Sequence, residues 1–516
     1  MGVIKRQGIQ GTLVSYIGIV LGYINLMLIY PAVLQKEQIG LISVMISVAG
    51  LFAVFCQLGM SNTAIRFFPQ FRDDESGHRG LLIWLLLIPG AGFLLFLALW
   101  FFLNPLLLAP YQANSPLLTE YAHWLLPMTF FMMFSMLLES WSSIFQRITM
   151  PRIFREVVLK LLSAASVLLY YFGALSFPAF ILMFVSGYAI SFLFLLVYII
   201  RLGRWHWKPD WQFASPSMLK QMAVYSLFII LGGVGSGLVT KVDQIMLSEL
   251  SGLADVAVYT IAMSIAVVIE IPMRALLQIT TPIVAQAIAD DDKVTLHHMY
   301  RKSSITQLIA GMFIFGGVWV NADLIFDLMP NGDAFRAGKY VIFWIGISKL
   351  FDLATSLNGV IVNNSKYYRV SLYLMGALAL LTILTNRIFI PIMGIEGAAL
   401  ATAISIFIYN LMMLAFVYRK FEVHPFSMRT MYLVIIFIVA LSLSMWITVP
   451  ELSAVSAAMP SKLQAMSITI VQVLLRSLLF TLLFVLPVWA LNISPDLNGA
   501  IQTAINRISK MLSRRE

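Results

Sequence analysis

Long apolar runs alternate with short segments that carry charge, proline or glycine along the whole chain. A helix of about 20 predominantly apolar residues crosses a hydrocarbon layer about 30 Å thick, and the runs reach that length. The pattern therefore predicts about fourteen transmembrane helices. The predicted spans lie near residues 9–34, 38–60, 80–103, 118–145, 154–173, 176–201, 217–243, 252–279, 303–329, 336–362, 368–392, 395–418, 429–448 and 467–491.

The distribution of lysine and arginine tests this topology independently. Cytoplasmic loops carry an excess of positive side chains, so a correct helix count concentrates these residues in alternate loops. The amino-terminal segment and the junctions after even-numbered spans, counted with the adjoining ends of the spans, contain 25 of the 34 basic residues, Arg155 among them. The loops after odd-numbered spans contain only Lys36, Arg336, Lys339, Arg387 and Lys462. We therefore predict that both termini lie in the cytoplasm.

Composition also favours a membrane protein. Hydrophobic residues make up 60% of the chain and charged residues only 11%, compared with about 25% charged residues in soluble globular proteins. The net charge of +10 is dispersed among short loops, so we expect no nucleic-acid partner. The apolar run from Ile9 to Tyr30 is long for a secretory signal and is interpreted as a retained first helix. The single cysteine, Cys56, excludes a disulfide framework.

Two segments separated by 218 residues, from Gly40 to Val258, indicate an internal repeat. IYPAVLQKEQIGLISVMISVAGLF and MLSELSGLADVAVYTIAMSIAVVI each contain a helix end, a short acidic loop and a helix rich in small residues. The offset predicts two six-helix lobes, residues 1–201 and 221–418, connected by a basic linker at 202–220. Because six is even, both lobes enter the membrane in the same orientation, and a substrate path is expected between such parallel repeats.

The remaining sequence adds two helices at 429–491 and a terminal segment at 492–516. In the terminal segment, apolar residues recur at helical spacing opposite basic ones: Ile501, Ala504, Ile505, Ile508, Met511 and Leu512 against Arg507, Lys510, Arg514 and Arg515. This pattern predicts a short amphipathic helix on the cytoplasmic membrane surface, held by apolar insertion and anionic lipids. A frayed basic tail is the alternative interpretation.

Four stretches carry a resemblance to a known family. They are KRQGIQGTLVSYIG, IGLISVMISVAGLFAVFCQLGMSNTAIRFFP, TKVDQIMLSEL followed by VYTIAMSI, and PIMGIEGAALATAIS. Their ordered combination resembles the oligosaccharide-lipid (O-antigen type) flippases of the multidrug, oligosaccharidyl-lipid and polysaccharide (MOP) exporter superfamily. One departure is Val258, where the family usually has glycine before the tyrosine.

The resemblance implies a V-shaped helical bundle that alternates between inward-open and outward-open states. Its implied substrate is a polyprenyl-diphosphate-linked oligosaccharide that crosses the bilayer during surface polysaccharide, O-antigen or lipopolysaccharide assembly. It also implies a location in the bacterial inner membrane and partners such as a polysaccharide polymerase or ligase.

Ionisable side chains inside the predicted spans require a partner, a wet cavity or a function, because each costs about 2.5–3.5 kcal/mol on insertion scales. Three close pairs and two residues without a local partner occur: Lys241 and Asp243, Glu270 and Arg274, Lys349 and Asp352, then Glu139 and Arg476. The second and third pairs are spaced so that each can meet on one helix face, whereas the first cannot easily do so.

In the functional interpretation, Arg274, Lys349 and Lys241 line a central cavity and hold the diphosphate, with Arg274 as a bidentate donor. In the alternative interpretation, intrahelical ion pairs satisfy these charges, and Lys241 and Arg476 extend to the membrane surface. Arg66, just after the second span, is a further candidate for contact with a headgroup at the cytoplasmic mouth. The positive-inside rule also accounts for Arg66.

Two energy sources are consistent with the sequence. An inside-negative membrane potential favours outward movement of an anion by about 2.3 kcal/mol per charge per 100 mV. Alternatively, a proton or sodium ion is coupled to transport, with Asp243, Glu270, Asp352 and Glu139 as candidate carriers.

We expect neither enzymatic activity nor a cofactor. A polymerase or ligase acting on lipid-linked sugars would carry a large outward loop with acid–base residues, but the longest outward loops, near 104–117 and 449–466, contain no histidine. The acidic runs at 73–75 and 290–292 have no nucleotide-binding domain around them, and the adjacent histidines at 297–298 lack further ligands for a metal. The absence of a Walker motif excludes ATP as the direct energy source.

Three other functions stay open at this point. A multidrug exporter of the same superfamily would favour acidic residues in its cavity, whereas the spans here contain both signs. A lipid II flippase is closer in chemistry, and a non-transporting scaffold for polysaccharide enzymes is more distant.

Overall fold

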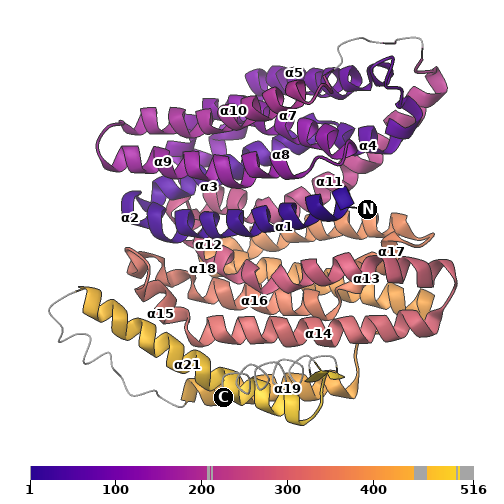
Figure 1. Ribbon diagram of the computed structural model, residues 1–516. Helices are drawn as coiled ribbons and strands as arrows, with labels where there is room; N and C mark the ends of the chain where they lie inside the picture. Colours follow the sequence, from indigo (N-terminus) through magenta and orange to yellow (C-terminus); the bar gives the residue numbers. More distant parts are fainter. Residues whose placement is uncertain (1, 206–209, 211–212, 447–461, 496–497, 500–516) are drawn as a thin grey trace, which may run out of the picture. The chain divides into compact units, whose positions relative to one another are not determined.

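The computed structural model describes residues 2–205, 210, 213–446, 462–495 and 498–499 (Figure 1). Helices connected by short turns account for nearly all of them, and no strand occurs within these ranges. Many of the helices are long and apolar enough to cross a membrane. The predicted all-α membrane fold is therefore confirmed.

The helices from the amino terminus up to Arg201 are α1 (Gly2–Tyr23), η1 (Ile24–Ile29), α2 (Tyr30–Val33), α3 (Lys36–Cys56), α4 (Met60–Phe71), η2 (His78–Gly80), α5 (Leu81–Leu108), η3 (Ala109–Tyr111), α6 (Pro116–Tyr121), η4 (Ala122–Trp124), α7 (Leu125–Ile144), α8 (Thr149–Ile153), η5 (Phe154–Val158), α9 (Leu159–Tyr171) and α10 (Phe177–Arg201). Here η denotes a short 3-10 or π helix.

The helices that follow are α11 (Pro216–Leu250), α12 (Leu253–Val267), η6 (Val268–Glu270), α13 (Ile271–Ala289), α14 (Lys293–Val320), α15 (Ala322–Asp327), η7 (Gly332–Gly338), α16 (Lys339–Ala354), α17 (Leu357–Asn363), α18 (Tyr368–Phe421), α19 (Met428–Trp446) and α21 (Lys462–Ala490). The predicted amphipathic helix that begins at Ile501 lies outside the described residues.

The number of membrane spans stays a prediction. By length and composition, ten stretches of the described helices can cross a membrane, and the bent pair Gly332–Ala354 and Leu357–Asn363 brings the total to eleven. One of the ten is α18, whose 54 residues contain both the eleventh and twelfth predicted spans. The count of about fourteen is thus not confirmed.

Two glycines in the stretches that carry the family resemblance have a structural reason. Gly394 is the non-helical residue that interrupts α18, with φ 57° and ψ −129°, a conformation that side chains with a Cβ rarely adopt. Gly40 lies on α3 where the chain approaches the start of α12, and a Cβ at this position would be 1.9 Å from the Leu253 carbonyl oxygen.

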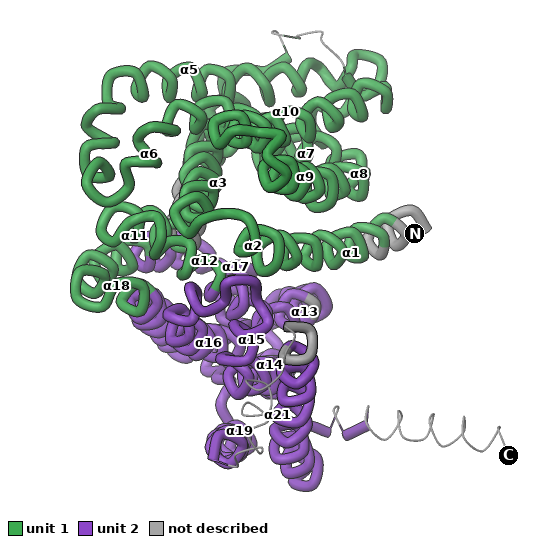
Figure 2. The backbone as a smooth tube through the Cα atoms, turned by 90° about the vertical axis from the view of Figure 1, so that its left-hand side faces the viewer, with its two compact units in different colours: residues 1–261, 379–398 green, residues 262–378, 399–516 purple. Residues whose placement is uncertain are grey.

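The chain divides into two compact units, which Figure 2 distinguishes by colour. Unit 1 contains residues 1–261 and 379–398, and unit 2 contains residues 262–378 and 399–516. The lobes, the linker and the appended helices expected from the sequence stay a prediction.

Each unit has its own buried core. In unit 1, side chains of α3, α4, α5, α7 and α10 pack around the fully buried Trp141. In unit 2, α14, α16, α19 and α21 pack around Phe315 and Phe480. A second cluster in unit 2 joins α13, α14, α17 and α18 around Tyr300. The helices beyond residue 429 therefore contribute to the core of unit 2.

Candidate functional site

Charged side chains from η6, α13 and α16 form a cluster in unit 2. Lys349 Nζ lies 2.8 Å from Glu270 Oε2 and 3.7 Å from Asp352 Oδ2. Arg274 Nη2 lies 3.8 Å from Glu270 Oε1. The two pairs that could each meet on one helix face in the sequence therefore do so, and they also join each other. We call Glu270, Arg274, Lys349 and Asp352 the Lys349 network.

The members of the Lys349 network differ in their exposure. The side chains of Lys349, Glu270 and Asp352 are 17%, 23% and 24% exposed, whereas that of Arg274 is 68% exposed. Lys349 lies between two carboxylates, so these three groups together carry one excess negative charge when ionised. Arg274 balances that charge over a long contact, and its guanidinium keeps donors available for another anion.

Neutral polar side chains extend this network into the helices of unit 2. Asn410 on α18 donates to Asp352 Oδ1, and Thr355 Oγ1 donates to Asn410 Oδ1 at 3.1 Å. Tyr300 on α14 donates its hydroxyl proton to Asn358 on α17. Buried polar groups in an apolar core need such hydrogen-bond partners. Isolated asparagines within apolar runs are the sequence signal that could have indicated these hydrogen bonds.

Unit 1 contains a deeply buried carboxylate, Asp243 on α11, which is 2% exposed. The Tyr259 hydroxyl donates to Asp243 Oδ2, and Asn386 Nδ2 donates to Asp243 Oδ1 at 2.7 Å. Asn386 is itself fully buried, and its side-chain amide oxygen, Oδ1, has no hydrogen-bond partner among the described residues. Lys241 lies on the same helix as Asp243 and is partly buried.

A polar pocket of about 360 Å³ lies in unit 1, between the α3–α4 break, α7 and the start of α8 and η5. We call it the Glu139 pocket; its lining residues are Gln57, Ser61, Asn62, Met136, Glu139, Ser140, Ser143, Ile148, Pro151, Arg152 and Arg155. Positive φ angles at Leu58 and Gly59 end α3 and start α4, which places polar side chains from both helices at the pocket.

Glu139 has a partner that the sequence did not indicate. Arg155 Nη1 donates to Glu139 Oε2, and Arg155 Nε lies 3.2 Å from Glu156 Oε1. Glu156 also pairs with Lys160 at 3.0 Å, and Lys160 donates to the Gly18 carbonyl of α1 at 2.8 Å. Arg155 is one of the basic residues that the positive-inside pattern places in a cytoplasmic junction. No sequence signal pointed to the amide, hydroxyl and arginine groups of this pocket.

Arg66, the remaining candidate, lies on α4 in unit 1. Its guanidinium carbon is 4.2 Å from the centroid of the Tyr225 ring on α11. This cation–π contact leaves the hydrogen-bond donors of the guanidinium edge available.

Two family models match the chain. The model described as polysaccharide biosynthesis protein matches residues 5–288, which is more than half of the chain. The model named MatE matches residues 216–388. No curated protein matches the chain.

Solved structures of two kinds of transporter share the fold. The lipid II flippase MurJ in an inward closed conformation is 15% identical, with a TM-score of 0.67 over 92% of this chain and 98% of that one. An inward-facing multidrug resistance MATE family transporter of the MOP superfamily is also 15% identical, with a TM-score of 0.61 over 76% of this chain and 92% of that one. A MATE structure in the bent conformation is 16% identical, with a TM-score of 0.52 over 81% and 96%. The fold expected from the MOP resemblance is therefore confirmed.

Proposed function

The chain belongs to the polysaccharide biosynthesis protein family, and on this premise we propose that it flips a polyprenyl-diphosphate-linked oligosaccharide across the membrane. Transport occurs by alternating access in the bacterial inner membrane, with both termini in the cytoplasm. The oligosaccharide is used for surface polysaccharide such as O-antigen, and a polymerase or ligase acts on it as a partner.

The Glu139 pocket is the observation that carries this proposal. Gln57 and Asn62 offer amides, and the serines of α4 and α7 offer hydroxyl groups, which are the side chains that hydrogen-bond to sugars. Arg152 and Arg155 add guanidinium groups that suit phosphate oxygens. A lipid-linked sugar diphosphate needs both kinds of partner at membrane depth.

Arg274 is proposed as the main diphosphate ligand in unit 2. Its guanidinium is exposed and its contact with Glu270 is long, at 3.8 Å. An arriving diphosphate can therefore form charge-assisted hydrogen bonds with Arg274 without breaking a short ion pair. Glu270 keeps its 2.8 Å contact with Lys349 meanwhile.

The other cations have distinct proposed roles. Lys349 supplies a second positive charge near the diphosphate and holds both carboxylates of its network in place. Lys241 on α11 is a further substrate ligand. Arg66, stacked on Tyr225, contacts the headgroup at the cytoplasmic mouth.

For the energy source, the membrane potential and a coupled ion are both part of the proposal. An outward-moving anion gains about 2.3 kcal/mol per charge per 100 mV from an inside-negative potential. Of the candidate ion carriers, Asp243 is buried and accepts from neutral donors, Tyr259 and Asn386. Glu139, Glu270 and Asp352 are each paired with a cation.

A lipid II flippase is the second candidate function. The match to MurJ covers 92% of this chain, whereas the match to the inward-facing MATE transporter covers 76%. The larger coverage favours a lipid-linked substrate over a drug. Lipid II also carries a sugar on a polyprenyl diphosphate, so the same chemistry would bind it.

Deletion of the gene provides the test. We expect lipid-linked oligosaccharide to accumulate on the cytoplasmic leaflet, and complementation by the wild-type gene to clear it. Arg274→Gln should fail to complement, Arg274→Lys should complement partly, and Arg476→Gln, which removes another arginine from an apolar helix, should complement fully. Accumulation of lipid II instead would replace the proposed cargo by the second candidate. Full complementation by Arg274→Gln at normal expression would remove Arg274 from the binding site.

A further inference from the structure

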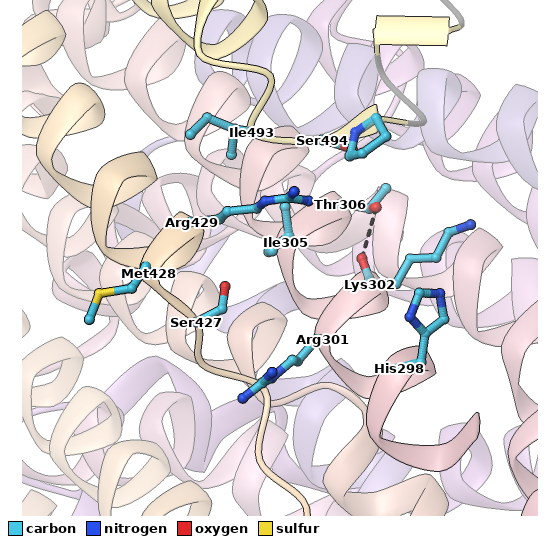
Figure 3. A pocket seen from close by; sticks show the side chains of 11 residues that line it. His298, Arg301, Lys302, Ile305, Thr306, Ser427, Met428, Arg429, Ile493 and Ser494 are labelled. Carbon is cyan, nitrogen blue, oxygen red and sulfur yellow. Dashed lines mark hydrogen bonds between the residues drawn. The ribbon is translucent and has the colours of Figure 1, made fainter. Parts of the chain in front are cut away.

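A basic cavity of about 540 Å³ lies in unit 2 and shares no lining residue with the Lys349 network (Figure 3). It is formed by the first turns of α14, the start of α19 and the residues that follow α21. Its lining residues are His298, Arg301, Lys302, Ile305, Thr306, Ser427, Met428, Arg429, Ile493, Ser494 and Pro495. We call it the Arg301 cavity.

The Arg301 cavity is lined by three cationic side chains. Arg429 extends from the start of α19 toward Thr306 on α14, and Arg301 extends from α14 toward the segment before α19 (Figure 3). Lys302 adds a third cation, and Ser427 and Ser494 add hydroxyl groups. No carboxylate occurs among these lining residues, in contrast to the Lys349 network.

Two contacts at the edge of the cavity hold its walls in place. Lys293 Nζ lies 2.7 Å from Glu422 Oε2, which ties the segment before α19 to the first turn of α14. Arg301 Nη2 and His424 Nε2 are 3.2 Å apart, so the same segment is attached a second time. Val423 between them is buried. The cavity is therefore built by tertiary contacts before any ligand enters.

The donors of the Arg301 guanidinium are only partly used. Arg301 contacts His424 through one terminal nitrogen, while its Nε is buried and has no hydrogen-bond partner. The backbone amides at the start of α19 add a partial positive charge that favours an anion. A phosphate oxygen is the acceptor that guanidinium groups bind best, because two parallel hydrogen bonds form at once.

Apolar surface beside the cavity indicates that the phosphate belongs to a lipid. Ile305, Met428 and Ile493 line the cavity along with the cations. Met428 is 70% exposed, and the exposed apolar surface continues along α19 through Met431, Tyr432, Ile435 and Ile438. A soluble anion would gain nothing from this surface, whereas the acyl chains of a membrane lipid would lie along it.

We propose that the Arg301 cavity binds the phosphate of an anionic membrane lipid, with Arg301 and Arg429 as its principal ligands. The bound lipid contacts α14, the start of α19 and the residues that follow α21, and it thereby stabilises the packing of these three segments. This site is separate from the transported cargo, so the proposal stands independently of the substrate identity.

Native mass spectrometry of the purified full-length chain, titrated with phosphatidylglycerol, tests the proposal. The double variant Arg301→Gln/Arg429→Gln is compared with Lys366→Gln/Arg369→Gln, which removes the same charge around the start of α18, outside the cavity lining. We expect the apparent Kd for phosphatidylglycerol to rise about tenfold or more in the first variant and to stay within about twofold in the second. Arg429→Gln alone, which alters no described contact that builds the cavity, should weaken binding in the same direction.

Two competitors identify the source of the phosphate. Phosphatidylcholine should bind more weakly than phosphatidylglycerol, and millimolar inorganic phosphate should not displace the bound lipid. Unchanged phosphatidylglycerol affinity in both cavity variants would overturn the proposal. Displacement by inorganic phosphate, with the same dependence on Arg429, would assign the cavity to a soluble phosphate and reject the lipid.

Discussion

Lys349 Nζ on α16 lies 2.8 Å from Glu270 Oε2 on η6, and this single contact connects two intrahelical pairs into one network. Each pair alone would satisfy its own charges within one helix. Joined, they make Glu270 the shared anionic partner of Lys349 and Arg274. The loss of Glu270 therefore affects two cations at once.

The first prediction is that Glu270→Gln destabilises unit 2. The change replaces the nearer carboxylate partner of a mostly buried lysine by a neutral amide, so Asp352, at 3.7 Å, is the one carboxylate left beside Lys349 in the network. We expect the free energy of unfolding to fall by roughly 1–3 kcal/mol, the range for a buried polar group without a partner. Because these side chains keep some exposure to solvent, the value should lie in the lower part of this range. A lower apparent Tm of the protein in detergent measures the effect.

Glu249→Gln is the matched control for Glu270→Gln. Glu249 pairs with Arg387 at 2.7 Å, but Arg387 is 60% exposed, so the loss should stay below about 1 kcal/mol. The triple variant Glu270→Gln/Lys349→Met/Asp352→Asn should recover much of the lost stability, because it also removes the charges that would be left without a partner. Additive losses in the triple variant would contradict the network.

The second prediction concerns the Glu139 pocket. Asn62 lines it, and its side chain is exposed to the pocket rather than buried in the core. Asn62→Ala should raise the KM for transport of the lipid-linked oligosaccharide about two- to tenfold, the value of one sugar hydrogen bond. Transport into proteoliposomes measures the KM, and the apparent Tm should not change.

Asn364→Ala provides the control for Asn62→Ala. Asn364 is an exposed amide of unit 2 that donates only to its own helix, at 2.8 Å from the Val360 carbonyl. Its loss should leave the KM unchanged. An equal rise of the KM in both variants would mean that Asn62 does not bind the sugar.

Local patterns were sufficient for the fold class and for part of the network. Hydropathy predicted the all-α membrane fold, and helical spacing predicted that Glu270 meets Arg274 and that Lys349 meets Asp352. The ordered stretches that resemble MOP flippases were confirmed at the level of the family and the fold. These features depend on residues within one turn or on segment composition.

The contacts between different helices could not be predicted from the sequence. The bond from Lys349 to Glu270 depends on how η6 packs against α16. Glu139 on α7 contacts Arg155 on η5, although the positive-inside pattern alone accounted for that arginine. No periodicity in the sequence indicates such contacts, because they depend on how side chains pack between helices.

The third prediction concerns the interruption of α18. Gly394 has φ 57° and ψ −129°, so Gly394→Ala should destabilise the chain by about 1–3 kcal/mol through backbone strain. Gly376→Ala in the same helix is the control, since no atom lies within 4 Å of the added Cβ and its φ is not positive. It should be neutral or stabilising by up to about 1 kcal/mol. Equal Tm values for the two variants would show that a side chain at residue 394 causes no backbone strain.

The last prediction separates ion coupling from voltage as the energy source. Asp243→Asn keeps the size of a buried side chain that accepts from Tyr259 and Asn386, and the Asn386 amide can turn to offer its free oxygen to the new amide. The fold should therefore persist while the ionisable group is lost. In proteoliposomes, this variant should no longer respond to a proton or sodium gradient but should still respond to the membrane potential. Asp327→Asn, at an exposed residue paired with Arg336, should keep both responses. If Asp243→Asn transport is still stimulated by the ion gradient, Asp243 is not the carrier.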